Sequence, residues 1–285
     1  MKIGIIGLGL MGGSFGKALV KKTNHIVYGY DLSNTVIEKA ISLNAIHYVL
    51  DTNNLSELDM LVVAIRPEFF TSSLTPFLPR LKKGAIVTDF CGVKRSIVDK
   101  MANFSKEFSN LVFVGGHPMA GRELSGINHS QSSLFDKASM ILVNVNANAN
   151  DIEILKDLYL SIGFSKVVET SSENHDSMIA YTSQLCHIVS NAFIKNAQAE
   201  KHVGYSAGSY LDLTRVARMN ADMWAGLMLA NGDKLLSELD EFLVNLTKYR
   251  DALKDGDVVG LRALLQEGNE RKIQIDVKRQ KTLEK

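Results

Sequence analysis

The chain has 285 residues, of which 46% are hydrophobic and 22% charged, and its formal net charge is +1. A chain of this length can bury one large core or two modest ones, and its charge gives no indication of nucleic-acid binding. No apolar stretch reaches the roughly 20 residues that a membrane-spanning helix needs. The two cysteines, Cys91 and Cys186, have neither metal-ligand nor disulfide spacing. We therefore expect a cytoplasmic protein with reduced thiols, no metal site, no membrane contact and no nucleic-acid partner.

The first residues predict a loop that binds a dinucleotide. The apolar run Lys2–Ile6 leads into a segment with the spacing Gly-x-Gly-x-x-Gly. In such a loop the first glycine allows a tight turn, the second lets the pyrophosphate approach the backbone, and the third lets the next helix pack closely. The N-terminus of that helix favours the phosphate charge. The residues predicted to contact the cofactor are Gly7, Leu8, Gly9, Leu10, Met11 and Gly12.

Asp31 indicates which cofactor is used. It follows a second strand-like run, Ile26–Tyr30, near the roughly 20-residue offset of a ribose-binding carboxylate. A carboxylate accepts hydrogen bonds from both ribose hydroxyls but repels a 2′-phosphate, and no arginine follows it in Leu32–Thr35. These residues favour NAD over NADP. The alternative interpretation is a glycine-rich turn with an incidental acid after it.

Strand-like and helical patterns alternate through the first half of the chain. The expected strands are Lys2–Ile6, Ile26–Tyr30, His47–Val49, Met60–Ile65, Ala85–Asp89, Val112–Val114 and Met140–Val143. Strands separated by helical segments of about ten to fifteen residues predict an α/β Rossmann domain with a mainly parallel, doubly wound sheet. Ligands of such sheets bind beyond the carboxyl ends of the strands. We assign residues 1–172 to this NAD-binding domain.

Strand-like runs disappear after about Ser172. Segments such as His175–Ala197 and Asp233–Leu253 instead have apolar residues at helical spacing. Residues 173–285 are therefore predicted to form an all-α domain. The charged tail Arg271–Lys285 is interpreted as a solvated helix end.

His117 is the candidate catalytic base. It begins the pentapeptide His117-Pro118-Met119-Ala120-Gly121, which follows the strand-like run Leu111–Val114. Removing a hydride from a carbon that bears a hydroxyl requires a base for the hydroxyl proton, and an imidazole titrating near neutral pH is the usual choice. The alternative is a histidine whose hydrogen bonds are satisfied at a strand end.

Several motifs together resemble the prephenate/arogenate dehydrogenase family of tyrosine biosynthesis. They are Gly7-x-Gly9-x-x-Gly12, Gly116-His117-Pro118-Met119-Ala120-Gly121-x-Glu123, Leu134-Phe135, His175-Asp176, His187, Asp212-Leu213-Thr214-Arg215 and Met223-Trp224. The resemblance implies oxidative decarboxylation of prephenate to 4-hydroxyphenylpyruvate with NAD. It also implies that the helical domain, residues 173–285, binds the substrate and forms a homodimer. The chain resembles the minimal form of the family, without a fused chorismate mutase or a regulatory domain.

The resemblance also implies which residues bind the substrate. A substrate with two carboxylates requires cations, and Arg215 resembles the family's substrate-binding arginine, with Asp212 as its orienting partner. An ion pair within the domain is the alternative for Arg215. His187 resembles a histidine that contacts the substrate side chain, but as a lone histidine on an apolar helix it could equally belong to the core. Glu123 is expected to gate the pocket or to pair with Arg215. The motif residues interpreted as packing and domain-positioning residues are His175 and Trp224.

The chain departs from the family pattern at three places. Gly92 stands where the family usually has serine, so a hydroxyl expected near His117 is absent. Gln184 replaces the first histidine of a His-Leu-Pro-His motif, and Asn220, which can cap a helix, replaces an aspartate before proline. We keep Gly92 and Gln184 in the predicted substrate site. The departures weaken the substrate assignment more than the fold or the cofactor.

Three alternatives to prephenate dehydrogenase remain open. Arogenate dehydrogenase is the first, because arogenate carries an ammonium group in place of the pyruvyl ketone and requires acceptors where prephenate requires donors. A 3-hydroxyacid or imine reductase would share the glycine loop, and Ala64–Pro67 resembles pyrroline-carboxylate reductases, but that class is not expected to carry the motif at His117. The third alternative is a non-catalytic NAD-binding module.

Overall fold

The computed structural model describes residues 1–122 and 124–283, which form two compact units, residues 1–232 and 233–285. Glu123, one of the predicted site residues, lies outside the described residues. The domain boundary predicted at residue 172 lies between the last strand and the helices that follow it. As a boundary between domains it stays a prediction. Among the described residues, no helix combines the length and the apolar character needed to cross a membrane.

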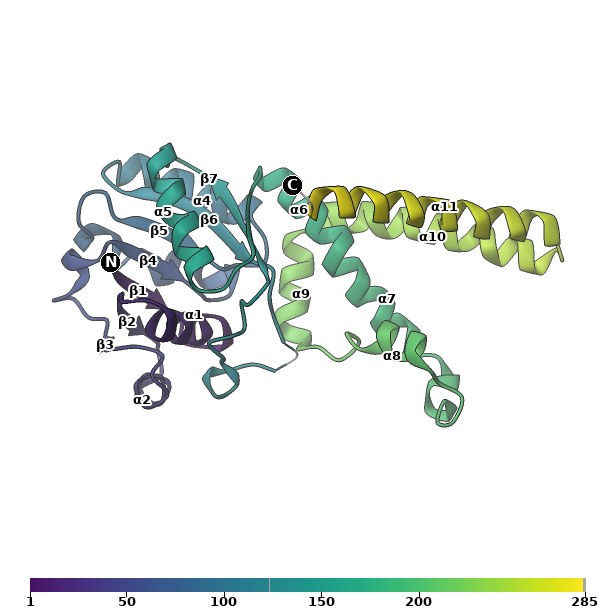
Figure 1. Cartoon of the computed structure of the whole chain (residues 1–285), viewed down its shortest axis with the longest axis horizontal. Coiled ribbons are helices and arrows are strands. Elements are labelled where there is room, and N and C mark those ends of the chain that lie inside the picture. The colour runs from purple at the N-terminus through teal and green to yellow at the C-terminus, as the bar shows by residue number, and fades with distance from the viewer. Residues whose placement is uncertain (123, 284–285) are drawn as a thin grey trace. The chain divides into compact units, whose positions relative to one another are not determined.

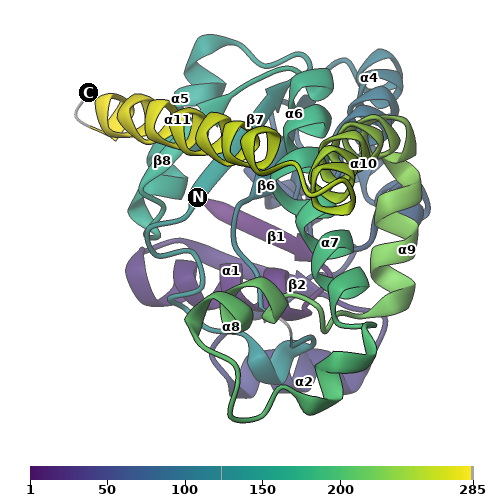
Figure 2. The ribbon, with the colours of Figure 1, turned by 90° about the vertical axis from the view of Figure 1, so that its right-hand side faces the viewer.

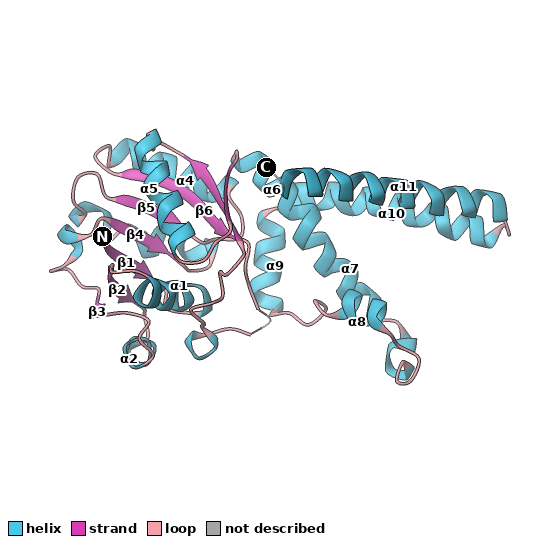
Figure 3. Cartoon of the chain, viewed as in Figure 1, coloured by secondary structure: helices cyan, strands magenta, loops and turns pink. Residues whose placement is uncertain are grey.

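The first unit is built around an eight-stranded sheet (Figures 1 and 3). The strands are β1 (Lys2–Ile6), β2 (Ile26–Tyr30), β3 (Tyr48–Val49), β4 (Met60–Val63), β5 (Ile86–Asp89), β6 (Val112–Pro118), β7 (Ser139–Asn144) and β8 (Lys166–Glu169). Their order is β3-β2-β1-β4-β5-β6-β7-β8, and every neighbouring pair is parallel except β6 and β7. The predicted α/β fold with a mainly parallel sheet is confirmed.

Two strands differ from the sequence prediction by more than a shift of one or two residues at an end. β6 continues to Pro118, because its second half pairs with the antiparallel strand β7, with His117 opposite Ile141. The paired glycines Gly115 and Gly116 have low strand propensity, so the local pattern ended the predicted strand too early. β8 was not predicted, since only its two central residues are apolar; it forms by pairing with β7.

Two buried clusters pack on opposite faces of the sheet. Along β4, Met60 and Val62 belong to the first cluster, whereas Leu61 and Val63 belong to the second. Successive side chains of a strand point to opposite faces, so the clusters lie on either side of the sheet. The helices that contribute to the first are α1 (Leu10–Lys22), α2 (Asn34–Ser42) and α5 (Ala149–Ser161), and those that contribute to the second are α3 (Phe70–Leu74) and α4 (Arg95–Glu107).

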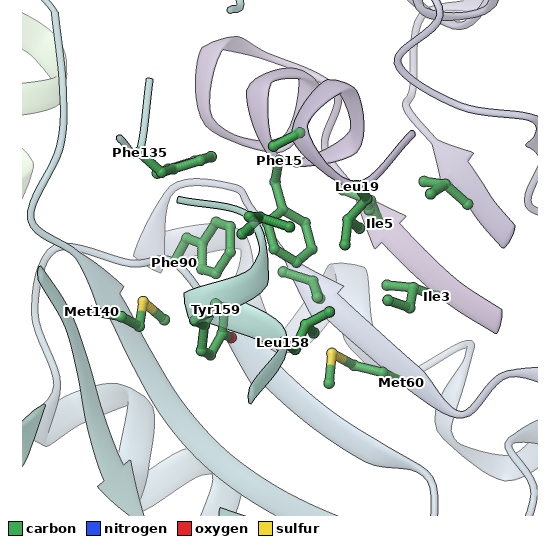
Figure 4. Close-up of a cluster of buried hydrophobic side chains, with 14 of the residues drawn as sticks. Ile3, Ile5, Phe15, Leu19, Met60, Phe90, Phe135, Met140, Leu158 and Tyr159 are labelled. Atoms are coloured by element: carbon green, nitrogen blue, oxygen red, sulfur yellow. The ribbon is translucent and has the colours of Figure 1, made fainter. Parts of the chain in front are cut away.

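Aromatic rings fix α1 to the sheet. Phe15 of α1 packs edge-to-face on Phe90, with ring centroids 5.0 Å apart and planes at 89°. Figure 4 shows Phe15, Phe90 and Tyr159 gathered in the first cluster. Burying a side chain of this size stabilises the fold by about 1.5–3 kcal/mol. The helix that follows the glycine loop is therefore held in place by the core.

The remaining helices of the first unit follow β8. They are α6 (Ser172–Ile179), a π-helical segment η5 (Ala180–Leu185), α7 (Cys186–Phe193), α8 (Gly208–Thr214) and α9 (Ala221–Ala230). α9 lies beside α7 in both views (Figures 1 and 2). Asn220 caps α9, because its side chain accepts a hydrogen bond from the N–H of Met223 at 2.9 Å. A π-helical segment inside a helical run is often found at a functional site.

The second unit consists of two long helices, which begin at its boundary with the first. α10 (Gly232–Lys254) and α11 (Val258–Leu283) are joined by a short turn in which Gly256 has a φ of +67°. The hydroxyl of Tyr249 on α10 donates a hydrogen bond to the carbonyl oxygen of Leu264 on α11 at 3.2 Å. Many apolar side chains of this unit are exposed, and they include Leu236, Leu243, Val244, Leu253, Val258, Val259, Leu265, Ile273 and Ile275.

Candidate active site

The turn between β1 and α1 is shaped by two tightly packed glycines. Gly7 has a φ of +89°, which side-chain-bearing residues rarely adopt, and a Cβ there would lie 2.6 Å from the carbonyl oxygen of Ala64. A Cβ at Gly12 would lie 1.9 Å from the carbonyl oxygen of Gly7. At Gly9, by contrast, no atom lies within 4 Å of the Cβ position. Protein atoms thus fill the space beside Gly7 and Gly12, whereas the space beside Gly9 is open.

The N-terminus of α1 is suited to an anion. Gly9 is its N-cap residue, no side chain caps it, and its first turn, which begins with Leu10 and Met11, contains no acidic residue. The first N–H groups of a helix have no partner within the helix, and the helix dipole favours negative charge at this end. The open space at Gly9 and the uncapped helix together fit the pyrophosphate of a dinucleotide.

Asp31 is held beside this turn at the end of β2. Its Oδ2 accepts a hydrogen bond from the N–H of Leu8 at 2.9 Å, and its Oδ1 accepts one from the N–H of Ser33 at 3.0 Å. Each carboxylate oxygen can accept a second hydrogen bond. The carboxylate is therefore oriented by the backbone and retains acceptor capacity for ribose hydroxyls.

His117 belongs to a chain of hydrogen-bonded side chains. Its Nδ1 lies 2.9 Å from Nε2 of His175, and Nδ1 of His175 lies 2.7 Å from Oδ1 of Asp176. β6 supplies the first residue, and α6 supplies the other two. His117 is partly buried, whereas His175 and Asp176 are each 1% exposed. His175 was expected to be a packing and domain-positioning residue, and its ring centroid lies 5.1 Å from that of His117.

The start of α4 anchors Asp176. Oδ1 accepts a hydrogen bond from the N–H of Lys94 at 2.7 Å, and Oδ2 accepts bonds from the N–H and Nε of Arg95 at 3.0 and 3.2 Å. Burial by itself would raise the pKa of Asp176, but the bonds from His175, Arg95 and Lys94 outweigh it and leave the pKa below its usual value. Asp176 is therefore a carboxylate at neutral pH.

Both imidazoles are neutral at neutral pH. Burial lowers the pKa of His117 well below its usual value of 6.5, and the electrostatic interactions with Lys94 and with the ring of His175 lower it further. Burial also lowers the pKa of His175, although the bond to Asp176 opposes the shift. A neutral imidazole has one nitrogen that can accept a proton, so this site can hold a base.

A buried ion pair ties the loop after β5 to β6. The ammonium group of Lys94 donates to Asp89, and both side chains are 0% exposed. Asp89 also accepts hydrogen bonds from the N–H of Gly116 at 2.9 Å and of Cys91 at 2.7 Å. Gly116 precedes His117, so this pair fixes the backbone beside the candidate base. No role was predicted for Asp89 or Lys94. The feature that could have indicated the pair is a lysine five residues after an aspartate at the end of a strand.

Gly92 lies against α9. A Cβ at this position would lie 3.0 and 3.1 Å from the two δ carbons of Leu227. The leucine therefore takes up part of the space that a serine side chain would need here. A serine at this position would require Leu227 to move by a few tenths of an ångström.

Gln184 is fully buried and both ends of its amide are used within the protein. Its Nε2 donates to the carbonyl oxygen of Leu227 at 3.2 Å, and its Oε1 accepts from Asn231 Nδ2 at 2.9 Å. Asn231 also donates to the carbonyl oxygen of Asp176 at 2.8 Å and accepts from Nη2 of Arg95 at 3.1 Å. The structure thus places Gln184 in a network that joins η5, α9 and the anchor of Asp176. Its predicted contact with substrate stays a prediction.

His187 fixes the segment that carries Arg215. Its Nδ1 lies 3.0 Å from the carbonyl oxygen of Val216, and its ring centroid lies 3.9 Å from that of Trp224. Asn191, one helical turn later, donates to the carbonyl oxygen of Ala217 at 3.1 Å. Arg215 itself is exposed at the end of α8. α7 therefore holds both residues after Arg215 through hydrogen bonds.

One face of α9 connects these parts. Trp224 packs on His187, Leu227 contacts Gly92 and Gln184, and Asn231, just past the end of α9, reaches Arg95 and Asp176. Residues three and four positions apart lie on the same face of a helix. α9 thereby links the surroundings of His117 to the segment of Arg215.

Models of two domains match the chain. The prephenate dehydrogenase nucleotide-binding domain matches residues 15–168, and the prephenate dehydrogenase dimerization domain matches residues 171–267. Together these matches extend from the glycine-loop helix into α11.

Individual relatives are similar over most of their length. A cyclohexadienyl dehydrogenase of Zymomonas mobilis is 32% identical over 267 residues, which cover 90% of each chain. The crystal structure of Synechocystis arogenate dehydrogenase has a TM-score of 0.80 at 25% identity and covers 96% of this chain and 100% of that one. The structure of A. aeolicus prephenate dehydrogenase with hydroxyphenyl propionate and NAD+ has a TM-score of 0.81 at 25% identity. It covers 96% of this chain and 98% of that one. These findings confirm the resemblance drawn from the motifs, and the chain belongs to the prephenate dehydrogenase family.

Proposed function

We propose that the chain catalyses the NAD-dependent oxidative decarboxylation of prephenate to 4-hydroxyphenylpyruvate. The observation that carries the proposal is the imidazole of His117, which lies at the carboxyl end of β6 within 2.9 Å of Nε2 of His175. Strands β1, β2, β4, β5 and β6 are parallel, so their carboxyl ends share one edge of the sheet. The turn at Gly7 and the carboxylate of Asp31 lie at that same edge, where sheets of this kind bind ligands.

The cofactor would be held by Gly7, Gly9, Gly12 and Asp31. The open position at Gly9 and the uncapped start of α1 suit its pyrophosphate, and Asp31 suits an unphosphorylated ribose. When bound, NAD supplies the acceptor for a hydride. The negative charge of Asp31 would disfavour the 2′-phosphate of NADP.

His117 would take the proton of the ring hydroxyl as the carbinol carbon loses its hydrogen with both bonding electrons. The bond from the ring to its carboxylate then breaks, carbon dioxide leaves, and the electron pair completes the aromatic ring. The phenolic oxygen recovers the proton from His117, so the reaction releases no net proton from this group. Proton acceptance by a positioned base contributes about 10²–10⁴-fold to a rate.

Arg215 would bind a substrate carboxylate. A guanidinium can grip a carboxylate through two parallel hydrogen bonds, and the exposed position of Arg215 leaves it accessible to ligand. His187 would act here by holding Val216 in place, in addition to the contact with the substrate side chain that the family resemblance implies.

Arogenate is the second candidate substrate, because a family relative, the Synechocystis enzyme, is an arogenate dehydrogenase. The two substrates differ in the side chain, where a ketone in prephenate is replaced by an ammonium group in arogenate. An ammonium needs acceptors, whereas a ketone needs donors. Measuring NADH formation with each substrate side by side would distinguish the two candidates. A higher kcat/KM with prephenate is expected, and a higher kcat/KM with arogenate would overturn the substrate assignment while leaving the reaction class.

We also propose that the chain forms a homodimer. The dimerization-domain match includes α10 and the first part of α11, and the exposed apolar side chains of these helices need a partner surface. A soluble monomer would leave this apolar surface in water.

A further inference from the structure

We propose that His175, oriented by Asp176, fixes the tautomer of His117, so that Nε2 of His117 is the nitrogen that accepts the substrate proton. His175 is thus a positioning residue that acts through His117. This inference rests on the proposed function, in which His117 is the base. It deepens that function by assigning the proton to a particular ring nitrogen.

The assignment begins at Asp176. An ionised carboxylate can only accept hydrogen bonds, and Oδ1 of Asp176 lies 2.7 Å from Nδ1 of His175. Nδ1 of His175 must therefore carry a hydrogen. Because His175 is neutral, its Nε2 carries the lone pair and can only accept.

The acceptor nitrogen of His175 determines where His117 carries its hydrogen. Nε2 of His175 lies 2.9 Å from Nδ1 of His117 and needs a donor. His117 therefore carries its hydrogen on Nδ1. Since His117 is also neutral, its Nε2 holds the lone pair and is the proton acceptor.

The surroundings keep this chain of bonds from reorganising. Three donors from Lys94 and Arg95 hold Asp176, and Asn231 holds its backbone carbonyl. A rotation of the carboxylate would break bonds to buried N–H groups, each of which costs about 1–3 kcal/mol when left unsatisfied. The orientation of His175 is set by this anchored carboxylate.

Because Gly92 stands where serine was expected, the hydrogen bond with His175 has greater weight in orienting His117. A glycine offers no hydroxyl to orient His117, and Leu227 packs against the position instead. Of the side chains in the described part of the molecule, His175 is the one whose hydrogen bond to the ring of His117 is seen. Orientation of the base therefore depends on α6.

The direct test is the protonation of the ring nitrogens of His117. Long-range ¹⁵N–¹H correlation spectra of protein labelled in its seven histidines distinguish a protonated from an unprotonated ring nitrogen. The signals of His117 are identified by their loss in His117→Asn. We expect a protonated Nδ1 and an unprotonated Nε2 at neutral pH. A protonated Nε2 on His117 would overturn the inference.

Two substitutions of His175 sharpen the test. His175→Leu removes the acceptor, so His117 should populate both tautomers, and kcat should fall by at least about tenfold with little change in KM. His175→Gln places an amide oxygen near the same position, and it should restore the Nδ1–H form and much of kcat. His25→Leu and His25→Gln, before the first residue of β2, serve as controls and should change neither the signals of His117 nor kcat. Thermal melting shows whether the variants are folded.

The outcomes separate this inference from the proposed function. If His117→Asn keeps full turnover, the proposed base is wrong, whatever the spectra show. If His117→Asn is slow but His175→Leu changes neither the tautomer nor kcat, the proposed function stands and the inference fails. If His175→Leu unfolds, the spectrum of the unmodified protein and the behaviour of His175→Gln decide the inference.

Discussion

The surroundings of His117 and the helices α10 and α11 differ in which side chains are buried and which are exposed. Around His117, buried charged and polar side chains are paired within one chain: Lys94 with Asp89, and Asp176 with His175 and Arg95. In α10 and α11, apolar side chains are exposed and the ion pairs, such as Lys272–Asp276, lie at the surface. The buried charges of the first region are paired within a single chain, whereas the second region has exposed apolar side chains that a partner could cover. Substitutions should therefore change stability and catalysis in the first, and assembly in the second.

The largest effect is expected from breaking the buried ion pair. Lys94→Met leaves the carboxylate of Asp89 without its cation in a site with no exposure, which costs about 3–5 kcal/mol of unfolding free energy. Lys272→Met removes the cation of an exposed pair on α11 and should cost at most about 1 kcal/mol. Urea unfolding of both variants measures the difference. Equal costs would contradict the contrast between the two regions.

Arg215→Ala should raise KM for prephenate by about 10–100-fold, because a charged hydrogen bond contributes about 1.5–3 kcal/mol. KM for NAD should change little, since Arg215 has no part in the proposed cofactor site. Arg215→Lys should recover only part of the loss, because it keeps the charge but loses the planar fork. Steady-state kinetics with each substrate varied in turn provide the measurement. An unchanged KM for prephenate in Arg215→Ala would remove this residue from the substrate site.

A charge on the α10–α11 surface should weaken the dimer. Val259 is 80% exposed in the single chain, and Val259→Glu places a carboxylate on apolar surface that a partner would cover. We expect the dissociation constant to rise by at least about tenfold. Gln274→Glu adds the same charge at a polar position of α11 and is the matched control. Sedimentation over a range of concentrations measures both, and an unmodified chain that is monomeric at micromolar concentration would refute the homodimer.

The elements that depend on local pattern were predictable from the sequence. The alternation of strand-like and helical runs predicted a mainly parallel sheet, and the spacing of Gly7, Gly9 and Gly12 predicted a glycine turn after its first strand. The structure has both. β8 and the second half of β6 were not predicted, because each is formed by pairing with β7, a contact that no local pattern records.

The hydrogen-bonded partners of His117 depend on distant parts of the chain. His175 lies 58 residues away in sequence, and the donors to Asp176 lie 81 and 82 residues from it. A His-Asp dipeptide in a helix does not show which side chain it will meet. From its residue type, His117 was expected to titrate near neutral pH. Burial instead lowers the pKa of His117 well below 6.5. The shift follows from packing and not from residue type.

The central claim, that His117 accepts the substrate proton, is tested most directly by the pH dependence of kcat for prephenate with and without this side chain. The base works when it is neutral, so kcat should fall as the pH drops through the pKa of His117, and burial places that fall below pH 6.5. In His117→Asn, kcat should be lower by about 10²–10⁴-fold and should lose this acid limb. A variant that retains the acid limb or full turnover would contradict the account.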